Sequence, residues 1–67
     1  MQGVIAKIVE ARGFGFISPA DGSKDVFFHC RDLDGLTFDE QLVERRVAFE
    51  VLSSDRGPRA VNVRPAQ

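Results

Sequence analysis

The chain is a succession of short apolar runs separated by turn residues, all within 67 residues. Five runs have the length of a strand and are rich in β-branched or aromatic residues: 4–9, 13–17, 25–30, 46–52 and 60–64. An open sheet of five such strands would leave unpaired edges and could not enclose a two-sided core. The pattern therefore predicts an all-β fold, a closed five-stranded antiparallel barrel. A small SH3-like barrel is the competing architecture.

Turn residues and breaks in the alternation locate the connections. Pro, Gly and Asp predict turns at 18–23, 34–35 and 54–58. The alternation of the first run breaks near Ile8 and Val9, which predicts a bulge there. Residues 36–45 are polar and aperiodic, so we expect a long loop with at most one helical turn, at 39–42.

Composition limits the class of protein. Hydrophobic residues make up 43% of the chain and charged residues 28%, as in ordinary globular domains rather than disordered chains. No apolar run approaches the roughly 20 residues of a membrane span. The first residues also lack the basic stretch and apolar block of a secretory signal. We therefore expect one domain over residues 1–67, located in the cytoplasm and not associated with a membrane.

The chain contains one cysteine and one histidine, which are adjacent. Cys30 cannot form an internal disulfide, which fits a reducing compartment. Together with His29 it offers too few ligands for structural zinc, so we expect no metal site and no cofactor. Neighbouring residues of a strand point to opposite faces, so we expect no nucleophile–base pair here and no enzymatic activity.

Charge is distributed unevenly along the chain. The net charge is −1 and the pI about 5.7, whereas nucleic-acid binders are commonly basic. Six of the ten acidic residues fall in 32–50, which we interpret as a solvated face on the side away from any nucleic acid. Residues 1–31 hold four basic residues against three acidic ones, so a local basic face is expected there.

Aromatic residues on two neighbouring strands carry the functional argument. In a strand, residues two apart share a face, so Phe14 and Phe16 point the same way and Ile17 points the other way. If Ile17 faces the core, both rings lie outside. The same reasoning applied to the next strand places Phe27 and His29 beside them. Three phenyl rings and an imidazole would then cover one outer surface.

A small domain gains no stability from leaving rings in water, so such a surface normally marks a binding site. Every nucleobase has a flat π-face, and a row of rings suits a single strand with splayed bases. We expect Gly13 and Gly15 to let a ligand backbone come close, and Arg12 to contact a phosphate or a base. In the alternative arrangement, Phe14 and Phe16 are core residues and Ile17 faces out.

Two further phenylalanines are predicted to lie in the core, and a third stays open. Phe28 falls on the presumed inner face of its strand, and Phe49 shares an inner face with Val47 and Val51. Phe38 lies in the polar loop, where it either closes the end of the barrel or adds a stacking ring; both interpretations stay open.

The two aromatic segments resemble the paired ribonucleoprotein motifs of the cold-shock domain family. The first motif, a basic residue followed by Gly-Phe-Gly-Phe and an aliphatic residue, is matched throughout by 12–17. The second, Val-Phe-Val-His-Phe, is matched by 26–30 except at Phe28 and Cys30. Residues 21–25, 56–58 and 60–63 are also similar to the family. The resemblance implies a five-stranded barrel of the OB-fold type that binds single-stranded RNA or DNA, as an RNA chaperone or cold-shock-type regulator.

The resemblance also implies roles for individual residues. The stacking positions of the family are occupied by Phe14, Phe16, Phe27 and His29. Phe38 and Arg56 match supporting contacts. Lys7 stands where the family has a tryptophan, and Cys30 replaces an aromatic residue. Each lost stack removes about 1–3 kcal/mol, so we expect weaker and more salt-dependent binding, with Lys7 contributing a phosphate contact.

A second function stays open beside nucleic-acid binding. The missing aromatic residues at positions 7 and 30 and the acidic pI fit a degenerate barrel whose aromatic face binds a protein or a second copy of the chain. We expect a monomer, with a weak homodimer through the phenylalanine face as the open alternative. Salt distinguishes the two functions, because phosphate contacts weaken steeply with ionic strength and apolar contacts do not.

Overall fold

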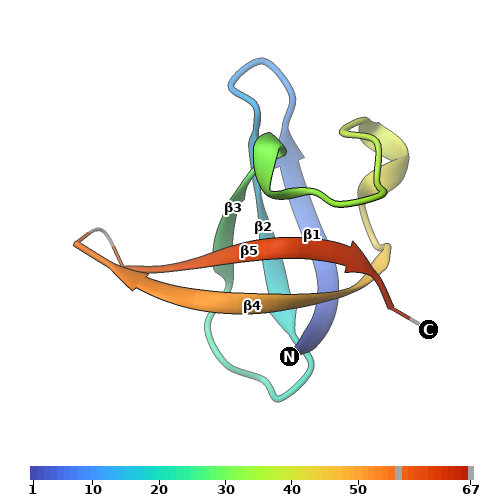
Figure 1. Ribbon diagram of the computed structural model, residues 1–67. Helices are drawn as coiled ribbons and strands as arrows, with labels where there is room; N and C mark the ends of the chain where they lie inside the picture. Colours follow the sequence, from blue (N-terminus) through green and yellow to red (C-terminus); the bar gives the residue numbers. More distant parts are fainter. Residues whose placement is uncertain (56, 67) are drawn as a thin grey trace.

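The computed structural model describes residues 1–55 and 57–66. It contains five strands and two short 3-10 helices (Figure 1). The strands are β1 (Gln2–Val9), β2 (Phe14–Pro19), β3 (Val26–His29), β4 (Arg46–Ser54) and β5 (Gly57–Pro65). The helices are η1 (Cys30–Asp32) and η2 (Glu40–Leu42). The all-β prediction with five strands is confirmed, η2 is the expected helical turn, and η1 was not expected.

The strands form one closed sheet in the order β1-β2-β3-β5-β4, with β4 paired back to β1. Four of the pairings are antiparallel, as predicted. The remaining pairing, β3 with β5, is parallel and brings Phe27 beside Arg59. In Figure 1 the β4–β5 hairpin lies across the other three strands, and its turn end extends beyond them.

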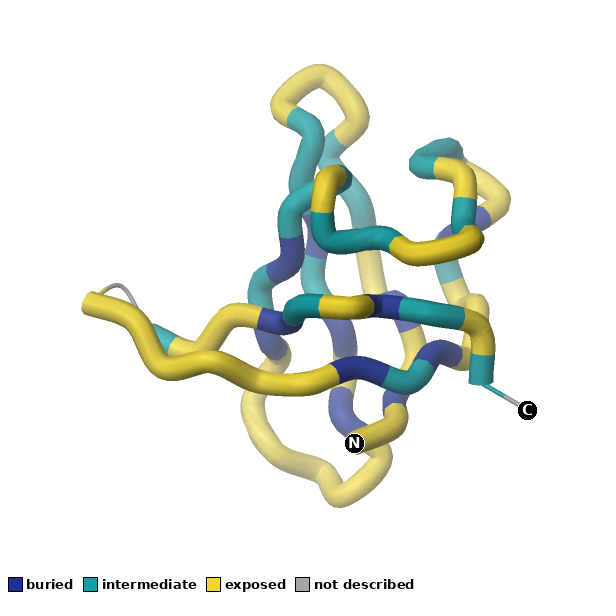
Figure 2. Tube along the Cα trace, viewed as in Figure 1, coloured by how far each residue is buried: buried dark blue, intermediate teal, exposed yellow. Residues whose placement is uncertain are grey.

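The interior of the closed sheet is apolar. Phe28 and Phe49 are fully buried, as the alternation predicted, together with Ile5, Ile17, Val47 and Val63. Burial of each such side chain contributes about 1.5–3 kcal/mol. Figure 2 shows the buried parts of the strands in dark blue. Since Ile17 is fully buried, the alternative that placed Phe14 and Phe16 in the core is wrong.

Gly15 is buried and provides space for the core, not for a ligand. A Cβ at this position would lie 2.8 Å from the Phe28 ring and 2.6 Å from the carbonyl oxygen of Lys7. Contacts this short do not occur, so Phe28 can fill the barrel only because residue 15 has no side chain. The expectation that Gly15 lets a ligand backbone come close is therefore corrected.

Two bulges redirect side chains relative to the sequence prediction. The bulge in β1 lies between Ile5 and Lys7, not near Ile8 and Val9. A second bulge interrupts the β4–β5 pairing between Ala48 and Glu50. Beyond it the hairpin leaves the barrel, so Val51 is 39% exposed and does not share the core face of Phe49. The exposed hairpin end is visible in Figure 2.

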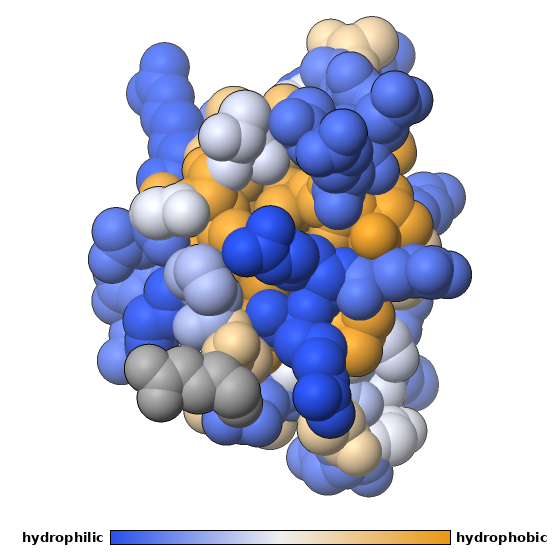
Figure 3. All heavy atoms as spheres, turned by 90° about the vertical axis from the view of Figure 1, so that its right-hand side faces the viewer, coloured by the Kyte–Doolittle hydropathy of each residue, from blue (hydrophilic) through white to orange (hydrophobic). Residues whose placement is uncertain are grey.

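The segment between β3 and β4 closes one end of the barrel. Leu42 of η2 is buried, and the half-buried Leu36 and Phe38 pack against the core. The Phe38 and Phe28 rings meet edge-on, with centroids 6.4 Å apart, so Phe38 closes the barrel end. On the side of the molecule that carries this segment, hydrophobic atoms are visible between hydrophilic side chains (Figure 3). Neither helix in the described part of the chain is long and apolar enough to cross a membrane.

Candidate nucleic-acid interface

Three phenylalanines form one cluster on the outer face of β2 and β3. We call Phe14, Phe16 and Phe27 the phenylalanine platform. The register pairs Phe16 with Phe27 and Phe14 with His29. Ring centroids are 5.4 Å apart for Phe14 and Phe27, 6.0 Å for Phe14 and Phe16, and 6.1 Å for Phe16 and Phe27. The period-2 prediction that these rings share an outer surface is confirmed at the level of geometry.

The platform is half-buried rather than fully immersed in water. Phe16 meets each of the other two rings in a nearly perpendicular arrangement, at 86° and 72°. Such edge contacts contribute about 0.5–1.5 kcal/mol per pair beyond the area they bury. Mutual packing therefore offsets part of the cost of an outward-facing aromatic surface and holds the rings in fixed relative positions.

His29 ends β3 and is held by the first turn of η1. Its backbone N–H donates to Oδ2 of Asp32 at 3.0 Å, and its ring Nδ1 accepts from the backbone N–H of Arg31 at 3.1 Å. Because Nδ1 is an acceptor in this bond, the hydrogen of the neutral ring lies on Nε2. The ring therefore offers Nε2–H as a donor beside Phe14.

Cys30 lies closer to the His29 ring than strand alternation predicts. Its Sγ is 3.7 Å from Nδ1, because the strand ends at His29 and the backbone turns into η1. The expectation that the two side chains point to opposite faces is wrong. Nδ1 nevertheless accepts the Arg31 N–H, so it is already engaged in a structural hydrogen bond.

The predicted cationic residues occupy different places. The Lys7 Nζ lies 5.7 Å from the centroid of the Phe16 ring, so this residue adjoins the platform. Arg12 is exposed in the turn between β1 and β2. Arg56 lies outside the described residues. Phe38 packs on the core at the barrel end and makes its ring contact with Phe28 rather than with the platform.

Arg59 is a site residue that the sequence analysis missed. It stands beside Phe27 on the neighbouring strand, and its guanidinium forms a two-bond ion pair with Asp32. A groove of about 600 Å³ runs between the rings of Phe16 and Phe27 and the β4–β5 turn, and Arg59 and Pro58 line it. The sequence carries no local signal for this placement, because β3 and β5 are joined by a parallel pairing between distant segments.

Asp32 belongs to the site rather than to a remote acidic face. Its side chain is only 11% exposed and bonds both the His29 N–H and Arg59. The interpretation of the whole 32–50 stretch as a solvated face directed away from the site is therefore wrong at this residue. Asp32 instead connects the end of β3 to β5.

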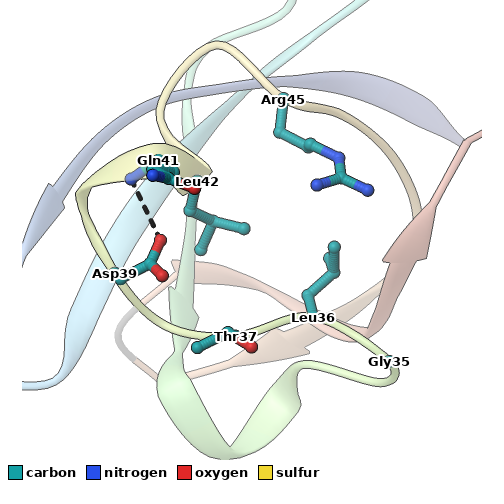
Figure 4. Close-up of a pocket in the computed structure, with 7 residues that line it drawn as sticks. All are labelled: Gly35, Leu36, Thr37, Asp39, Gln41, Leu42 and Arg45. Carbon is teal, nitrogen blue, oxygen red and sulfur yellow. Dashed lines mark hydrogen bonds between the residues drawn. The ribbon is translucent and has the colours of Figure 1, made fainter.

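A second, smaller hollow of about 200 Å³ lies in the segment that closes the barrel (Figure 4). Leu36, Leu42 and Arg45 surround it, and the Asp39 carboxylate accepts the Gln41 N–H at its rim. None of the platform residues lines it. Among residues 1–55 and 57–66, no three His, Cys, Asp or Glu side chains are grouped in a way that could hold a metal ion.

Known proteins share this sequence and this fold. A sequence model of the 'Cold-shock' DNA-binding domain matches residues 1–66. Cold shock-like protein CspC of Escherichia coli (strain K12) is 44% identical over 63 residues, which are 94% of this chain and 91% of that protein. Probable cold shock protein A of Mycolicibacterium smegmatis is 43% identical, covering 94% of each chain.

A solved structure, drosophila Unr CSD456, superimposes with a TM-score of 0.77 at 25% identity. The match covers 98% of this chain and 26% of that longer one. This neighbour supports the OB-fold type of the barrel, and the family match extends over nearly the full length. The chain therefore belongs to the 'Cold-shock' DNA-binding domain family.

Proposed function

We propose that this chain binds single-stranded RNA or DNA by stacking bases on Phe14, Phe16, Phe27 and His29. Lys7 and Arg12 supply positive charge to the ligand, and Phe38 is a supporting contact at the barrel end. Arg56, which lies outside the described residues, is included as a phosphate contact on its sequence match to the family alone. The family supports nucleic-acid binding in general, and the stacking surface is our assignment. In this account the domain works in the cytoplasm as an RNA chaperone or cold-shock-type regulator.

One observation carries the proposal. Three rings and an imidazole stand on paired positions of β2 and β3, on the outer side of a sheet whose inner side is filled by Ile17, Val26 and Phe28. The core does not need them there. Aromatic rings at the spacing of neighbouring strands suit the stacking of successive bases of a single strand.

We also propose that this chain binds single strands more weakly than family members that have aromatic residues at the positions of Lys7 and Cys30. Lys7 adjoins Phe16 with an ammonium instead of a ring, and Cys30 turns into η1 beside His29. An ammonium adds a salt-sensitive attraction to phosphate, whereas a ring would add a stack that salt hardly affects.

The main test separates base stacking from charge. A fluorescently labelled heptathymidylate is titrated with the protein, and a labelled heptamer of the same charge that carries abasic sugars is titrated in parallel. We expect the abasic strand to bind at least about tenfold more weakly, because it retains the phosphates and loses every stack. Equal affinity for the two strands would show that phosphate attraction alone holds the ligand, and the proposal would fail.

The second candidate is contact with a protein or with another copy of the chain. Its supporting observation is the apolar character of the platform itself. Sedimentation of the protein without nucleic acid, at low and high salt, tests it. A dimer that persists in high salt and is broken by Phe16→Leu would favour this alternative.

A further inference from the structure

The ion pair between Arg59 and Asp32 leaves one edge of the guanidinium unused. Nε donates to Oδ2 of Asp32 at 3.2 Å, and Nη2 donates to Oδ1 at 3.1 Å. These two bonds occupy the side of the fork formed by Nε and Nη2. A guanidinium carries five N–H donors in a fixed plane, so Nη1 and the second hydrogen of Nη2 remain on the outer edge.

Asp32 is a firm anchor for this arrangement. Its side chain is 11% exposed, whereas that of Arg59 is 46% exposed. Oδ2 also accepts the backbone N–H of His29, which fixes the carboxylate relative to the end of β3. The guanidinium is therefore held in orientation before any ligand arrives, which lowers the entropic cost of using its outer edge. The Asp32 carboxylate also compensates the positive charge of the guanidinium, so Arg59 attracts a phosphate less strongly than an unpaired arginine would.

The surroundings of Arg59 suit a base. The groove between the rings of Phe16 and Phe27 and the β4–β5 turn has a volume of about 600 Å³, and Arg59 and Pro58 form its other wall. Volumes of about 300–1,000 Å³ are typical of clefts that hold small-molecule ligands. The lining therefore combines the two aromatic rings with one guanidinium.

We propose that Arg59, oriented by Asp32, reads a guanine base in this groove. Guanine presents two neighbouring acceptors, O6 and N7, on one edge, and the outer edge of the guanidinium presents two parallel donors. Adenine has one acceptor and one donor there, and thymine has a single acceptor. This inference rests on the proposed function and adds a base preference to it.

The test uses heptathymidylate and seven variants of it, each with one guanine at a different position. Affinity is measured by fluorescence anisotropy. The readout is the affinity for each guanine-containing strand divided by the affinity for heptathymidylate. We expect one position, or two neighbouring ones, to gain about 5- to 150-fold in affinity. Replacing that guanine by 7-deazaguanine should remove most of the gain, because N7 is then no longer an acceptor.

Protein variants identify the residue responsible. In Arg59→Ala the affinity ratio of the preferred guanine strand to heptathymidylate should fall to near one. In Asp32→Asn this ratio should fall part of the way, because the Arg59 guanidinium is no longer held by two hydrogen bonds. Arg64→Ala, a matched arginine on the same strand whose Nη1 donates to the Asn62 carbonyl, should keep the wild-type ratio.

Each failure has a distinct meaning. If heptathymidylate itself does not bind, the proposed function fails. If it binds and no position prefers guanine, or if the preference survives in Arg59→Ala, the guanine inference alone is wrong. If Arg59→Ala weakens all eight strands equally and lowers the salt slope by about 0.7, Arg59 contacts a phosphate and not a base.

Discussion

The ammonium nitrogen of Lys7 lies 5.7 Å from the centroid of the Phe16 ring, across the β1–β2 pair. A cation at this distance from a ring is attracted by the π-electrons, with about 0.5–1 kcal/mol at an exposed site. Lys7 reaches the platform because the bulge between Ile5 and Lys7 shifts the register by one residue. Without that bulge, residue 7 would share the inner face of Ile5.

The position of Lys7 beside Phe16 predicts how an aromatic residue at position 7 would change nucleic-acid binding. Lys7→Trp should strengthen heptathymidylate binding about 5- to 150-fold at moderate salt, because one stack contributes about 1–3 kcal/mol. It should also lower the salt slope by about 0.7, because one phosphate contact is lost. Lys7→Ala is the control, since it removes the charge and adds no ring. A tryptophan variant that binds no better than wild type would refute our account of position 7.

The core requirement at Gly15 predicts a loss of stability. Gly15→Ala places a methyl group 2.8 Å from the Phe28 ring and 2.6 Å from a backbone oxygen. We expect the unfolding free energy to fall by about 1–3 kcal/mol, with a drop in Tm of at least about 4 °C. Thermal unfolding followed by circular dichroism measures it. Gly22→Asn serves as control, because a Cβ there meets nothing within 4 Å and Asn tolerates a positive φ. Equal Tm values for the two variants would contradict this explanation.

The two members of the Asp32–Arg59 pair should differ in their effect on stability. Asp32→Ala removes the acceptor of the His29 N–H as well as the ion pair, so we expect a loss of about 1–2 kcal/mol. Arg59→Ala removes a partly exposed cation only, with an expected loss of about 0–1 kcal/mol. Urea unfolding compares them. Asp32→Asn, which retains an oxygen acceptor for His29, should fall between the two. A larger loss for Arg59→Ala than for Asp32→Ala would contradict this expectation, because it would mean that leaving the Asp32 carboxylate without its cation costs more than losing both of its interactions.

Local hydrogen bonds lower the pKa of the Asp21 carboxyl. The hydroxyl and the backbone N–H of Ser23 donate to its carboxylate and hold the pKa of Asp21 below its ordinary value of 3.8. A lowered pKa in the folded state stabilises the fold above the unfolded value and loses that contribution as the pH falls through the folded value. An NMR titration of the Asp21 carboxyl should show a higher midpoint in Ser23→Ala. Ser53→Ala, at a distant exposed position, should leave the midpoint unchanged; a shift there as well would argue against the local cause.

The inward and outward positions of the side chains on β2 and β3 were predictable because they follow strand alternation. Ile17 and Val26 fix which side of β2 and β3 is inside, and the places of Phe14, Phe16, Phe27 and Phe28 follow from them. This inference needs only neighbouring residues, so the sequence alone predicts the platform. The family motifs lead to the same residues independently.

The parts that were missed depend on contacts between distant segments. The bulge between Ala48 and Glu50 is a property of the β4–β5 pair, and it exposes Val51 against its local pattern. Arg59 reaches Phe27 through the parallel β3–β5 pairing, which no local pattern indicates. Cys30 approaches His29 because a helical turn starts where a strand was expected to continue. These features are decided by tertiary packing, not by the intrinsic preference of the residues involved.

The central claim is that the platform rings bind bases by stacking, and the most direct test replaces rings while keeping apolar volume. Labelled heptathymidylate is titrated by anisotropy with wild type, Phe16→Leu and Phe27→Leu at two salt concentrations. Val4→Ala, at an exposed apolar position near the other end of β1, is the control, and circular dichroism verifies that each variant is folded. We predict salt-sensitive binding by wild type and Val4→Ala, weakened about 5- to 150-fold in each leucine variant. Folded leucine variants that bind as tightly as wild type would contradict the account.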